Sequence, residues 1–233
     1  MPITADQTKA VLKARSVLSA LPDAALDELL RRARTVHFGK GAAIYQRGDA
    51  GDSLMIILSG RVKIAIVTAD AREVVLNFLA EGDLNGELAA LDGKARSADA
   101  TALEGTEALV IFRRDLLPVL ESHPKAMLGI IEALAAKVRV MSAAVEHSGL
   151  QMNAKAASAL LRLAEQHGRA VADGTLIDLK LSQRDLGSYA GLSRENMNRQ
   201  LAELRDQGLI RLDGALIVIV DQDGLTDCAQ AED

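Results

Sequence analysis

The sequence has little cysteine and no long apolar run. Cys228 is the single cysteine, so the chain cannot form an internal disulfide, or a cysteine-held metal or iron–sulfur site by itself. One thiol also fits a reducing compartment. The N-terminus lacks the basic start and apolar block of a signal peptide, and no apolar run approaches the length of a membrane span. We therefore expect a cytoplasmic protein with no membrane partner.

The sequence also lacks an excess of positive charge. Its net charge is −5, which argues against a nucleic-acid binder of the simple basic kind. The tail after Val220 carries five acidic residues and neither lysine nor arginine, so subtracting its −5 leaves about zero for the rest. If DNA is bound, local geometry must recognise it, with weak long-range steering.

Motifs of enzymes are missing as well. The sequence contains no metal-ligand cluster, no nucleophile with a base, and no glycine loop for a nucleoside triphosphate, so we expect no enzyme. Hydrophobic residues make up 49% of the chain and low-complexity tracts are absent, which indicates a folded protein. A length of 233 residues allows one large domain or two modest ones.

The segment 124–149 is predicted to be a long helix with an open apolar seam. Pro124 suits a first helical turn, and Gly149 can take the left-handed conformation that ends a helix. Apolar residues recur at steps of three and four, as in a two-stranded coiled coil, although a buried core helix can show the same spacing. A narrow seam indicates a partner helix. The seam residues are Ile131, Leu134, Val138, Met141 and Val145.

In the first half of the chain, the spacing of apolar residues changes from a helical to a strand-like period after two short helices. Amphipathic helices are expected over 8–21 and 22–35, the second with Leu26, Leu29 and Leu30 on one side. Short apolar runs then alternate with glycine or aspartate clusters, which is typical of an all-β barrel or roll. The expected strands are 43–45, 53–58, 61–67, 73–79 and 107–112, and a short helical piece follows around 114–121.

The last third of the chain has the pattern of a helix-turn-helix. Ser182 opens one short helix with a capping-box pattern, and Gly191 lies in a turn. Ser193 then caps a second helix, which Gly208 closes. Two short helices joined by a glycine-containing turn are characteristic of this DNA-binding motif.

Flanking elements add a wing to this motif. A helix over 154–167, capped by Asn153 and ended by Gly168, precedes a strand over 176–181. A hairpin follows the second helix, because an Asp-Gly pair between apolar runs favours a type I′ turn. The hairpin is expected over 209–220 and its turn at Asp213-Gly214.

The second helix of the motif presents side chains that can read DNA bases. Met197, Leu201 and Leu204 are spaced to face the core. Arginine can bond to guanine, glutamate can accept from cytosine, and asparagine suits adenine. Such residues gather at the N-terminal end of the helix, which reaches the major groove in this motif. They are Arg194, Glu195, Asn198 and Arg199.

The β half contains a second candidate site over residues 86–98, GELAALDGKARSA. Gly86 permits a close backbone approach, and a short helix beginning near it would direct N–H groups toward an anion. Arg96 and Ser97 can bind a phosphate, and Glu87 can accept from a sugar hydroxyl. The stretch therefore predicts a pocket for a small phosphate ester, whereas each residue alone is more often an ordinary surface group.

Over residues 18–220 the sequence resembles the cyclic-AMP receptor protein (CRP/FNR) family of bacterial transcription regulators. GELAALDGKARSADA is similar to the family's phosphate-binding cassette, and LSQRDLGSYAGLSRENMNRQLAELRDQGLI is similar to its helix-turn-helix. The resemblance implies an α+β protein with a jelly-roll-like, cyclic-nucleotide-binding β-roll, a long central dimerisation helix and a C-terminal winged helix-turn-helix. The implied domains are 1–123, 124–149 and 150–221, with an acidic tail over 222–233.

The resemblance also implies roles in effector binding. Glu87 would hold the ribose 2′-hydroxyl, and Arg96 and Ser97 would hold the cyclic phosphate of cyclic AMP or cyclic GMP. No metal, haem or iron–sulfur cluster is implied. The implied nucleotide-binding residues are Gly86, Glu87, Leu88, Arg96, Ser97, Ala98, Met141 and Ser142.

For DNA, the resemblance implies that Arg194, Glu195 and Arg199 read a TGTGA-type half-site. The implied partners are double-stranded DNA, a second copy of the chain through the seam, and RNA polymerase. The implied DNA-binding residues are Ser182, Gln183, Ser193, Arg194, Glu195, Asn198 and Arg199.

The sequence departs from the family pattern at the base contact. Met141-Ser142 stands where the family's cyclic-AMP receptor has a Thr-Ser pair, so one hydroxyl is missing and the choice between cyclic AMP and cyclic GMP stays open. None of the four histidines lies in the cassette, and none is expected to bind haem. Two alternatives remain: a regulator that is constitutively competent or answers another effector, and a cyclic-nucleotide module of an enzyme or channel.

Overall fold

The computed structural model describes residues 4–146 and 151–230, which form two compact units. The first unit runs to Asp70 and resumes over Leu76–Arg139. The second comprises Ala71–Val75 and the chain from Val140 onward. Within the described ranges, no helix is both long enough and apolar enough to cross a membrane.

The N-terminal segment forms three short helices instead of the two expected. Ser16 adopts an extended conformation, and its side chain accepts a hydrogen bond from the Leu18 amide, so the first predicted helix is divided there. Leu26 and Leu29 of the last helix are buried, as their spacing predicted, and pack into the core of the unit. The helices are α1 (Ala5–Arg15), η1 (Val17–Ala20) and α2 (Asp23–Arg32).

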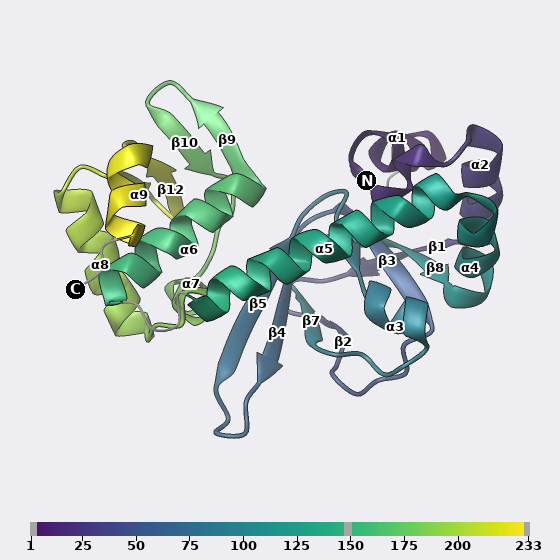
Figure 1. Ribbon diagram of the computed structural model, residues 1–233, viewed down its shortest axis with the longest axis horizontal. Coiled ribbons are helices and arrows are strands. Elements are labelled where there is room, and N and C mark those ends of the chain that lie inside the picture. The colour runs from purple at the N-terminus through teal and green to yellow at the C-terminus, as the bar shows by residue number, and fades with distance from the viewer. Residues whose placement is uncertain (1–3, 147–150, 231–233) are drawn as a thin grey trace. The chain divides into compact units, whose positions relative to one another are not determined.

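Two four-stranded sheets form the β-roll (Figure 1). The alternation of apolar runs with glycine or aspartate clusters predicted five of these strands. It missed the strands at residues 34–38, 84–85 and 99–102. The first sheet has the order β1 (Arg34–Phe38), β8 (Thr106–Phe112), β3 (Ser53–Ser59), β6 (Leu84–Asn85). The second has the order β2 (Ala43–Tyr45), β7 (Asp99–Ala102), β4 (Val62–Val67), β5 (Glu73–Leu79).

Strand β3 is buried on both of its faces. Leu54, Ile56 and Leu58 pack into a core shared with the helices, whereas Met55 and Ile57 pack into the core between the two sheets. Successive side chains of a strand point to opposite faces, so this run of apolar residues supplies both cores. The continuous run in the sequence therefore reflects a central strand covered on both sides.

Two short helices continue the first unit before the long helix α5. α3 (Glu87–Asp92) follows β6, and α4 (Arg113–Ser122) follows β8. α5 (Pro124–Glu146) begins at Pro124, as predicted, while its expected end at Gly149 lies outside the described residues. Ala126 and Ile130 of α5 are buried in the core that the helices share with β3.

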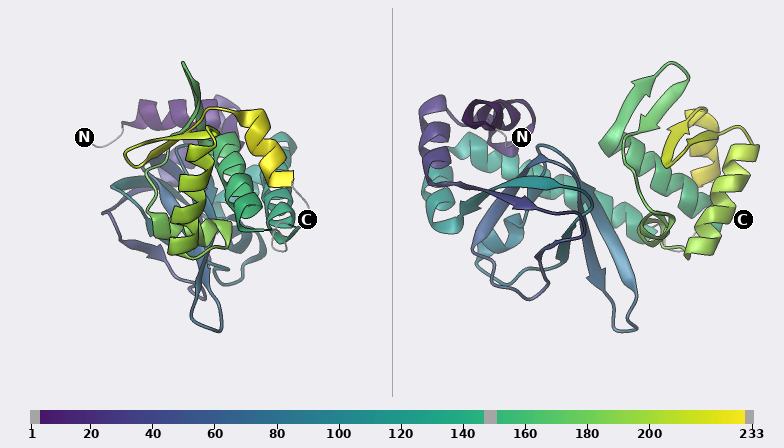
Figure 2. Two further views of the ribbon diagram at one scale, coloured as in Figure 1. Left: turned by 90° about the vertical axis from the view of Figure 1, so that its left-hand side faces the viewer. Right: turned by 180° about the vertical axis from the view of Figure 1, so that it is seen from behind.

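The second unit is a winged helix-turn-helix, and its secondary structure is visible in both views of Figure 2. Ser182 caps α7, Gly191 ends it in the left-handed conformation, and Ser193 caps α8, as predicted. Its sheet has the order β11, β12, β10, β9. The elements are α6 (Met152–His167), β9 (Gly168–Val171), β10 (Gly174–Ile177), α7 (Gln183–Ala190), α8 (Arg194–Asp206), β11 (Ile210–Asp213), β12 (Leu216–Ile219) and α9 (Gln222–Gln230).

Three local predictions in this unit are wrong. The strand expected over 176–181 lies at Gly174–Ile177 and ends before residue 178. α6 begins at Met152 with Gln151 at its cap, so Asn153 lies in the first turn, where its Oδ1 accepts from the Ala154 amide at 2.8 Å. In the wing, Asp213 pairs with Leu216, which makes Gly214 and Ala215 the two loop residues. Gly214 has a φ of +60° and Ala215 does not have a positive φ, whereas a type I′ turn needs positive values at both positions.

The segment expected to be an acidic tail contains a helix. α9 packs against α6, and Leu225 and Ala229 are buried (Figure 1). Cys228 is half-buried on the same helix, and burial raises the pKa of its thiol. The acidic residues of this segment therefore occupy the exposed side of an amphipathic helix at least as far as Gln230.

Candidate effector site and DNA-binding surface

The cassette begins with a glycine that no other residue could replace without strain. Gly86 has a φ of +76°, a conformation that side chains disfavour. A Cβ atom there would also lie 2.0 Å from Arg96 Nη1. Gly86 thus lets the chain pass from β6 into α3 while the Arg96 guanidinium packs directly against the turn.

Arg96 is 5% exposed and its guanidinium is held by backbone and side-chain acceptors. Nη1 donates to the carbonyls of Ser53 at 2.8 Å and Gly86 at 3.0 Å, and Nη2 donates to Ser53 Oγ at 2.9 Å. The Nε–H is buried and has no hydrogen-bond partner among the described residues. A buried donor without a partner costs free energy, which an anionic ligand oxygen could offset.

Glu87 is also 5% exposed and forms an ion pair that the sequence did not predict. Lys137 of α5 donates from Nζ to Glu87 Oε1 at 2.8 Å and to the Leu84 carbonyl at 3.0 Å. This contact joins the cassette to the long helix across 50 residues of sequence. Nothing in the spacing of Lys137 on α5 distinguished it from an ordinary exposed lysine.

Arg113, a second cation that sequence reasoning missed, binds the other end of α3. Its Nη1 donates to the carbonyl of Ala90 at 2.5 Å and to that of Leu91. The last carbonyls of a helix have no partner within the helix, so a cation at this end stabilises it. α3 is therefore fixed at its start by Glu87 and at its end by Arg113.

The remaining predicted nucleotide contacts differ in their exposure to solvent. Leu88 is 49% exposed, Ser97 is exposed and Ala98 is buried. Met141 and Ser142 are exposed and belong to the second unit, so their contribution to the effector site stays a prediction.

The apolar seam of α5 is largely uncovered in the single chain. Ile131 is 53% exposed and Val138 is 60% exposed, and Leu128, which the seam pattern omitted, is 53% exposed. Leu134 is half-buried and packs against the core of the first unit. The side chain of Val145, also predicted in the seam, lies outside the described residues.

The recognition helix α8 separates its two faces as the sequence predicted. Met197, Leu201 and Leu204 are buried. Gln200 is also buried, which the pattern did not indicate. The candidate DNA contacts on the other face are all exposed: Arg194, Glu195, Asn198 and Arg199, together with the cap residue Ser193.

Local hydrogen bonds fix the start of both helices of the motif. Ser182 Oγ accepts from the Asp185 amide at 3.0 Å, and Ser193 Oγ accepts from the Asn196 amide at 3.2 Å. Gln183, the other candidate near DNA phosphates, is only partly exposed. The backbone amide of Glu195 and the Ser193 hydroxyl hold the pKa of the Glu195 carboxyl below its usual range, so it is an ionised acceptor at neutral pH.

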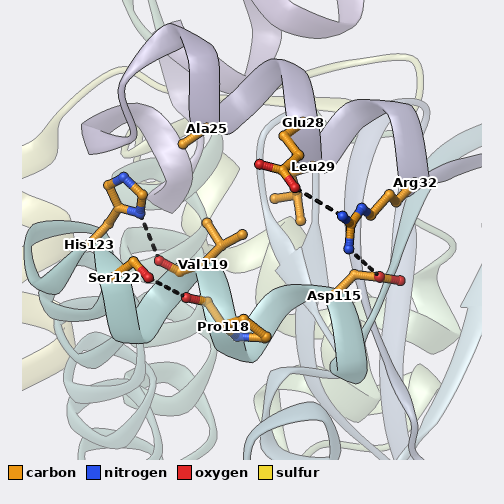
Figure 3. Close-up of a pocket in the computed structure, with 9 residues that line it drawn as sticks. All are labelled: Ala25, Glu28, Leu29, Arg32, Asp115, Pro118, Val119, Ser122 and His123. Carbon is orange, nitrogen blue, oxygen red and sulfur yellow. Dashed lines mark hydrogen bonds and ion pairs between the residues drawn. The ribbon is translucent and has the colours of Figure 1, made fainter.

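A shallow pocket between α2 and α4 contains none of the predicted site residues (Figure 3). Arg32 contacts Glu28 at 2.9 Å and Asp115 at 3.4 Å, so these charged groups bond with one another. We assign no ligand to this pocket. Its lining residues are Ala25, Glu28, Leu29, Arg32, Asp115, Pro118, Val119, Ser122 and His123.

Comparisons with known proteins match both parts of the chain to family models. The family model "Cyclic nucleotide-binding domain" matches residues 35–123, and "Crp-like helix-turn-helix domain" matches residues 154–228. The chain is 31% identical to the "Cyclic AMP receptor protein" of Thermus thermophilus over 176 residues, which are 75% of this chain and 78% of that protein.

Two further relatives cover more of the chain. The "CRP-like cAMP-activated global transcriptional regulator" of Mycobacterium tuberculosis is 27% identical over 216 residues, covering 92% of this chain and 96% of that protein. The solved structure of FixK2 from Bradyrhizobium japonicum has a TM-score of 0.76 at 23% identity, covers 86% of this chain and 99% of its own, and supports the fold.

The chain therefore belongs to the CRP/FNR family. It is a transcription regulator that combines a cyclic nucleotide-binding domain with a Crp-like DNA-binding domain, and it is not an enzyme.

Proposed function

We propose that the protein is a homodimeric, cytoplasmic transcription factor whose binding to a TGTGA-type palindrome is controlled by cyclic AMP or cyclic GMP. The observation that carries the effector assignment is the pair of buried charges that flank Gly86. Glu87 and Arg96 are each 5% exposed, and buried charges are rare unless they serve a partner or a ligand.

The chemistry of this pair matches a cyclic nucleotide. The unpartnered Nε–H of Arg96 can donate to an oxygen of the cyclic phosphate, and a guanidinium binds such a group more strongly than a neutral donor does. Glu87 can accept from the ribose 2′-hydroxyl. One cation and one anion on either side of a glycine turn thus distinguish the phosphate from the sugar.

Lys137 gives the effector a route to the long helix. Because Lys137 bonds to Glu87 at 2.8 Å, a ribose hydroxyl on Glu87 changes the environment of a residue on α5. The same helix carries the exposed seam that we assign to the dimer. Effector binding then alters the packing of the helix pair and shifts the population toward a DNA-competent dimer.

Titration of labelled palindromic DNA with and without cyclic AMP or cyclic GMP tests the control. We expect one nucleotide to tighten DNA binding, and by linkage DNA must tighten binding of that nucleotide by the same factor. The reciprocal titration by calorimetry measures the second factor. Equal DNA affinity in all cases would exclude effector control.

A second candidate is an effector-independent regulator of the same family. It is favoured by the three hydrogen bonds that Arg96 already makes to Ser53 and Gly86, since those donors are not available to a phosphate without rearrangement. Strong DNA binding by the nucleotide-free protein, together with no heat of nucleotide binding, would select this candidate.

The exposed seam supports the homodimer. Leu128, Ile131 and Val138 are each more than half exposed, and a row of apolar residues on one helix is stabilised by a second copy. Ile131→Asp should produce a monomer in sedimentation measurements and abolish binding to the palindrome. Val67→Asp is the matched control, because Val67 is 52% exposed and belongs to β4 instead of α5. A dimeric Ile131→Asp protein would exclude this interface.

The exposed face of α8 supports base recognition. Arg194, Glu195 and Arg199 are exposed at the N-terminal half of a helix whose opposite face is buried, which is the arrangement needed for entry into the major groove. RNA polymerase is the expected further partner by family resemblance.

A further inference from the structure

We infer that Tyr45 and Asn85 belong to the effector site: the Tyr45 ring positions Arg96, and the free amide N–H of Asn85 donates to the same ligand. This inference rests on the proposed effector function, and it adds two residues outside the cassette sequence.

The Tyr45 ring lies directly against the Arg96 guanidinium. Arg96 Cζ is 4.4 Å from the ring centroid, which is within the range of a cation–π contact. A guanidinium stacked on a ring keeps its plane, so its Nε–H keeps a fixed direction. Removing the ring therefore leaves Arg96 held only by its bonds to Ser53 and Gly86, so the direction of its Nε–H is less firmly fixed.

Asn85 fixes the far end of the Tyr45 ring. The Tyr45 hydroxyl donates to Asn85 Oδ1. Burial raises the pKa of Tyr45 to about 12, so the hydroxyl remains a neutral donor in the physiological range. Asn85 directly precedes Gly86, whose carbonyl accepts from Arg96, so the three side chains form one contiguous cluster.

Asn85 also retains an unused donor. It is 2% exposed, and its Nδ2 has no hydrogen-bond partner among the described residues. The other donor without a partner in this cluster is Nε of Arg96. Buried donors are almost always satisfied, so two unpaired donors, on the two residues that contact Tyr45 through other atoms, support a ligand oxygen within reach of both.

The test compares binding of cyclic AMP, cyclic GMP and adenosine to purified full-length variants by calorimetry or competition. Tyr45→Leu should weaken the cyclic nucleotide by about three- to thirty-fold, the range of a cation–π contact. Adenosine lacks the phosphate, so its binding should not change. Tyr45→Phe keeps the ring, so it should lose less affinity for the cyclic nucleotide than Tyr45→Leu does.

Asn85→Ala should weaken cyclic nucleotide binding more than Tyr45→Phe does, by about tenfold relative to wild type, because it removes a direct contact. Phe38→Leu is the matched control, since Phe38 and Tyr45 pack against the same core cluster. The control should leave the ratio of cyclic nucleotide to adenosine affinity unchanged.

The outcomes separate this inference from the proposed function. If wild type binds a cyclic nucleotide and Tyr45→Leu and Asn85→Ala do not change the affinity ratio, the two residues are structural only and the inference fails. Equal losses for all ligands would also overturn it. If wild type binds no cyclic nucleotide, both the inference and the proposed effector function are wrong.

Discussion

The cassette and the recognition helix hold their polar residues in opposite states. In the cassette, Glu87 and Arg96 are buried and already bonded to Lys137 and Ser53. On α8, the candidate base contacts are exposed and lie on one face of a helix whose other face is buried. One site is assembled by contacts within the protein, and the other is a surface.

This difference follows from the size of the two ligands. A small phosphate ester must be enclosed, so its contacts also stabilise the fold, and a substitution affects binding and stability together. DNA binds an open face, so base contacts can change without disturbing the core. Substitutions in the two regions should therefore have separable consequences.

The largest effect is expected from Arg96→Ala, which removes the proposed phosphate contact from the buried site. We expect nucleotide affinity to fall by about a hundredfold, because a hydrogen bond to a charged group contributes up to about 3 kcal/mol. Calorimetry measures the loss. Lys94→Ala is the control, because Lys94 is an exposed cation of the same stretch. Similar losses in both variants would show that general charge, and not the buried guanidinium, attracts the ligand.

Substitutions on α8 should change base selection without changing stability. Glu195→Ala or Arg199→Ala should each cost about 1–3 kcal/mol of discrimination at one position of the half-site. Selection from a random DNA library measures the preference, and thermal unfolding should be unchanged. Arg205→Ala, on the same helix and exposed, should keep the wild-type preference. An unchanged selection in the first two variants would contradict the assignment.

Lys137→Met tests whether a cassette contact also stabilises the fold. Glu87 would lose its cationic partner, and we expect the free energy of unfolding to fall by about 1–2 kcal/mol, because the Lys137 side chain is partly exposed. Urea unfolding measures this change. Lys125→Met, an exposed lysine of the same helix, should have little effect. Equal stabilities would mean that the ion pair contributes nothing measurable.

Ser193→Ala tests a contact on the DNA-binding side that also supports the fold. Loss of the cap on α8 should lower stability by about 1 kcal/mol. Ser19→Ala, at an exposed serine outside the motif, is the control. If DNA affinity falls by more than this destabilisation explains, Ser193 also contacts a DNA phosphate directly.

The smallest effect concerns pH. The pKa of the Glu195 carboxyl is lower in the folded protein than in the unfolded chain. The stability that the ionised carboxyl contributes is therefore complete above the unfolded pKa and is lost only as pH falls through the folded pKa. Discrimination at the base that we assign to Glu195 should therefore stay constant from about pH 7.5 to 5.5. Competition between matched and singly substituted DNA measures it, and a decline across this range would contradict the ionised acceptor.

The helix-turn-helix could be predicted closely because its determinants are local. Caps at Ser182 and Ser193 and the turn at Gly191 act within a few residues, and the apolar spacing of α8 specifies its buried face. The cassette motif could be predicted from the sequence equally well, but the residues that contact it could not. Lys137 and Tyr45 are far from Glu87 and Arg96 in sequence, and only the folded chain brings them together.

Two errors had a different origin. α9 was missed because the segment after Val220 carries five acidic residues and neither lysine nor arginine, although Leu225 and Ala229 are spaced to meet α6. The wing turn was misplaced because Asp-Gly is a strong local preference, whereas pairing of β11 with β12 sets the register one residue further on.

The double burial of β3 has a consequence for how the first unit opens. Its alternate residues belong to two cores, so neither core can be exposed while this strand keeps its place. Local openings should therefore bypass β3, and its amides should exchange with solvent only when the whole unit unfolds. Exchange of the β3 amides thus reports the global stability of the first unit, whichever nucleotide that unit binds.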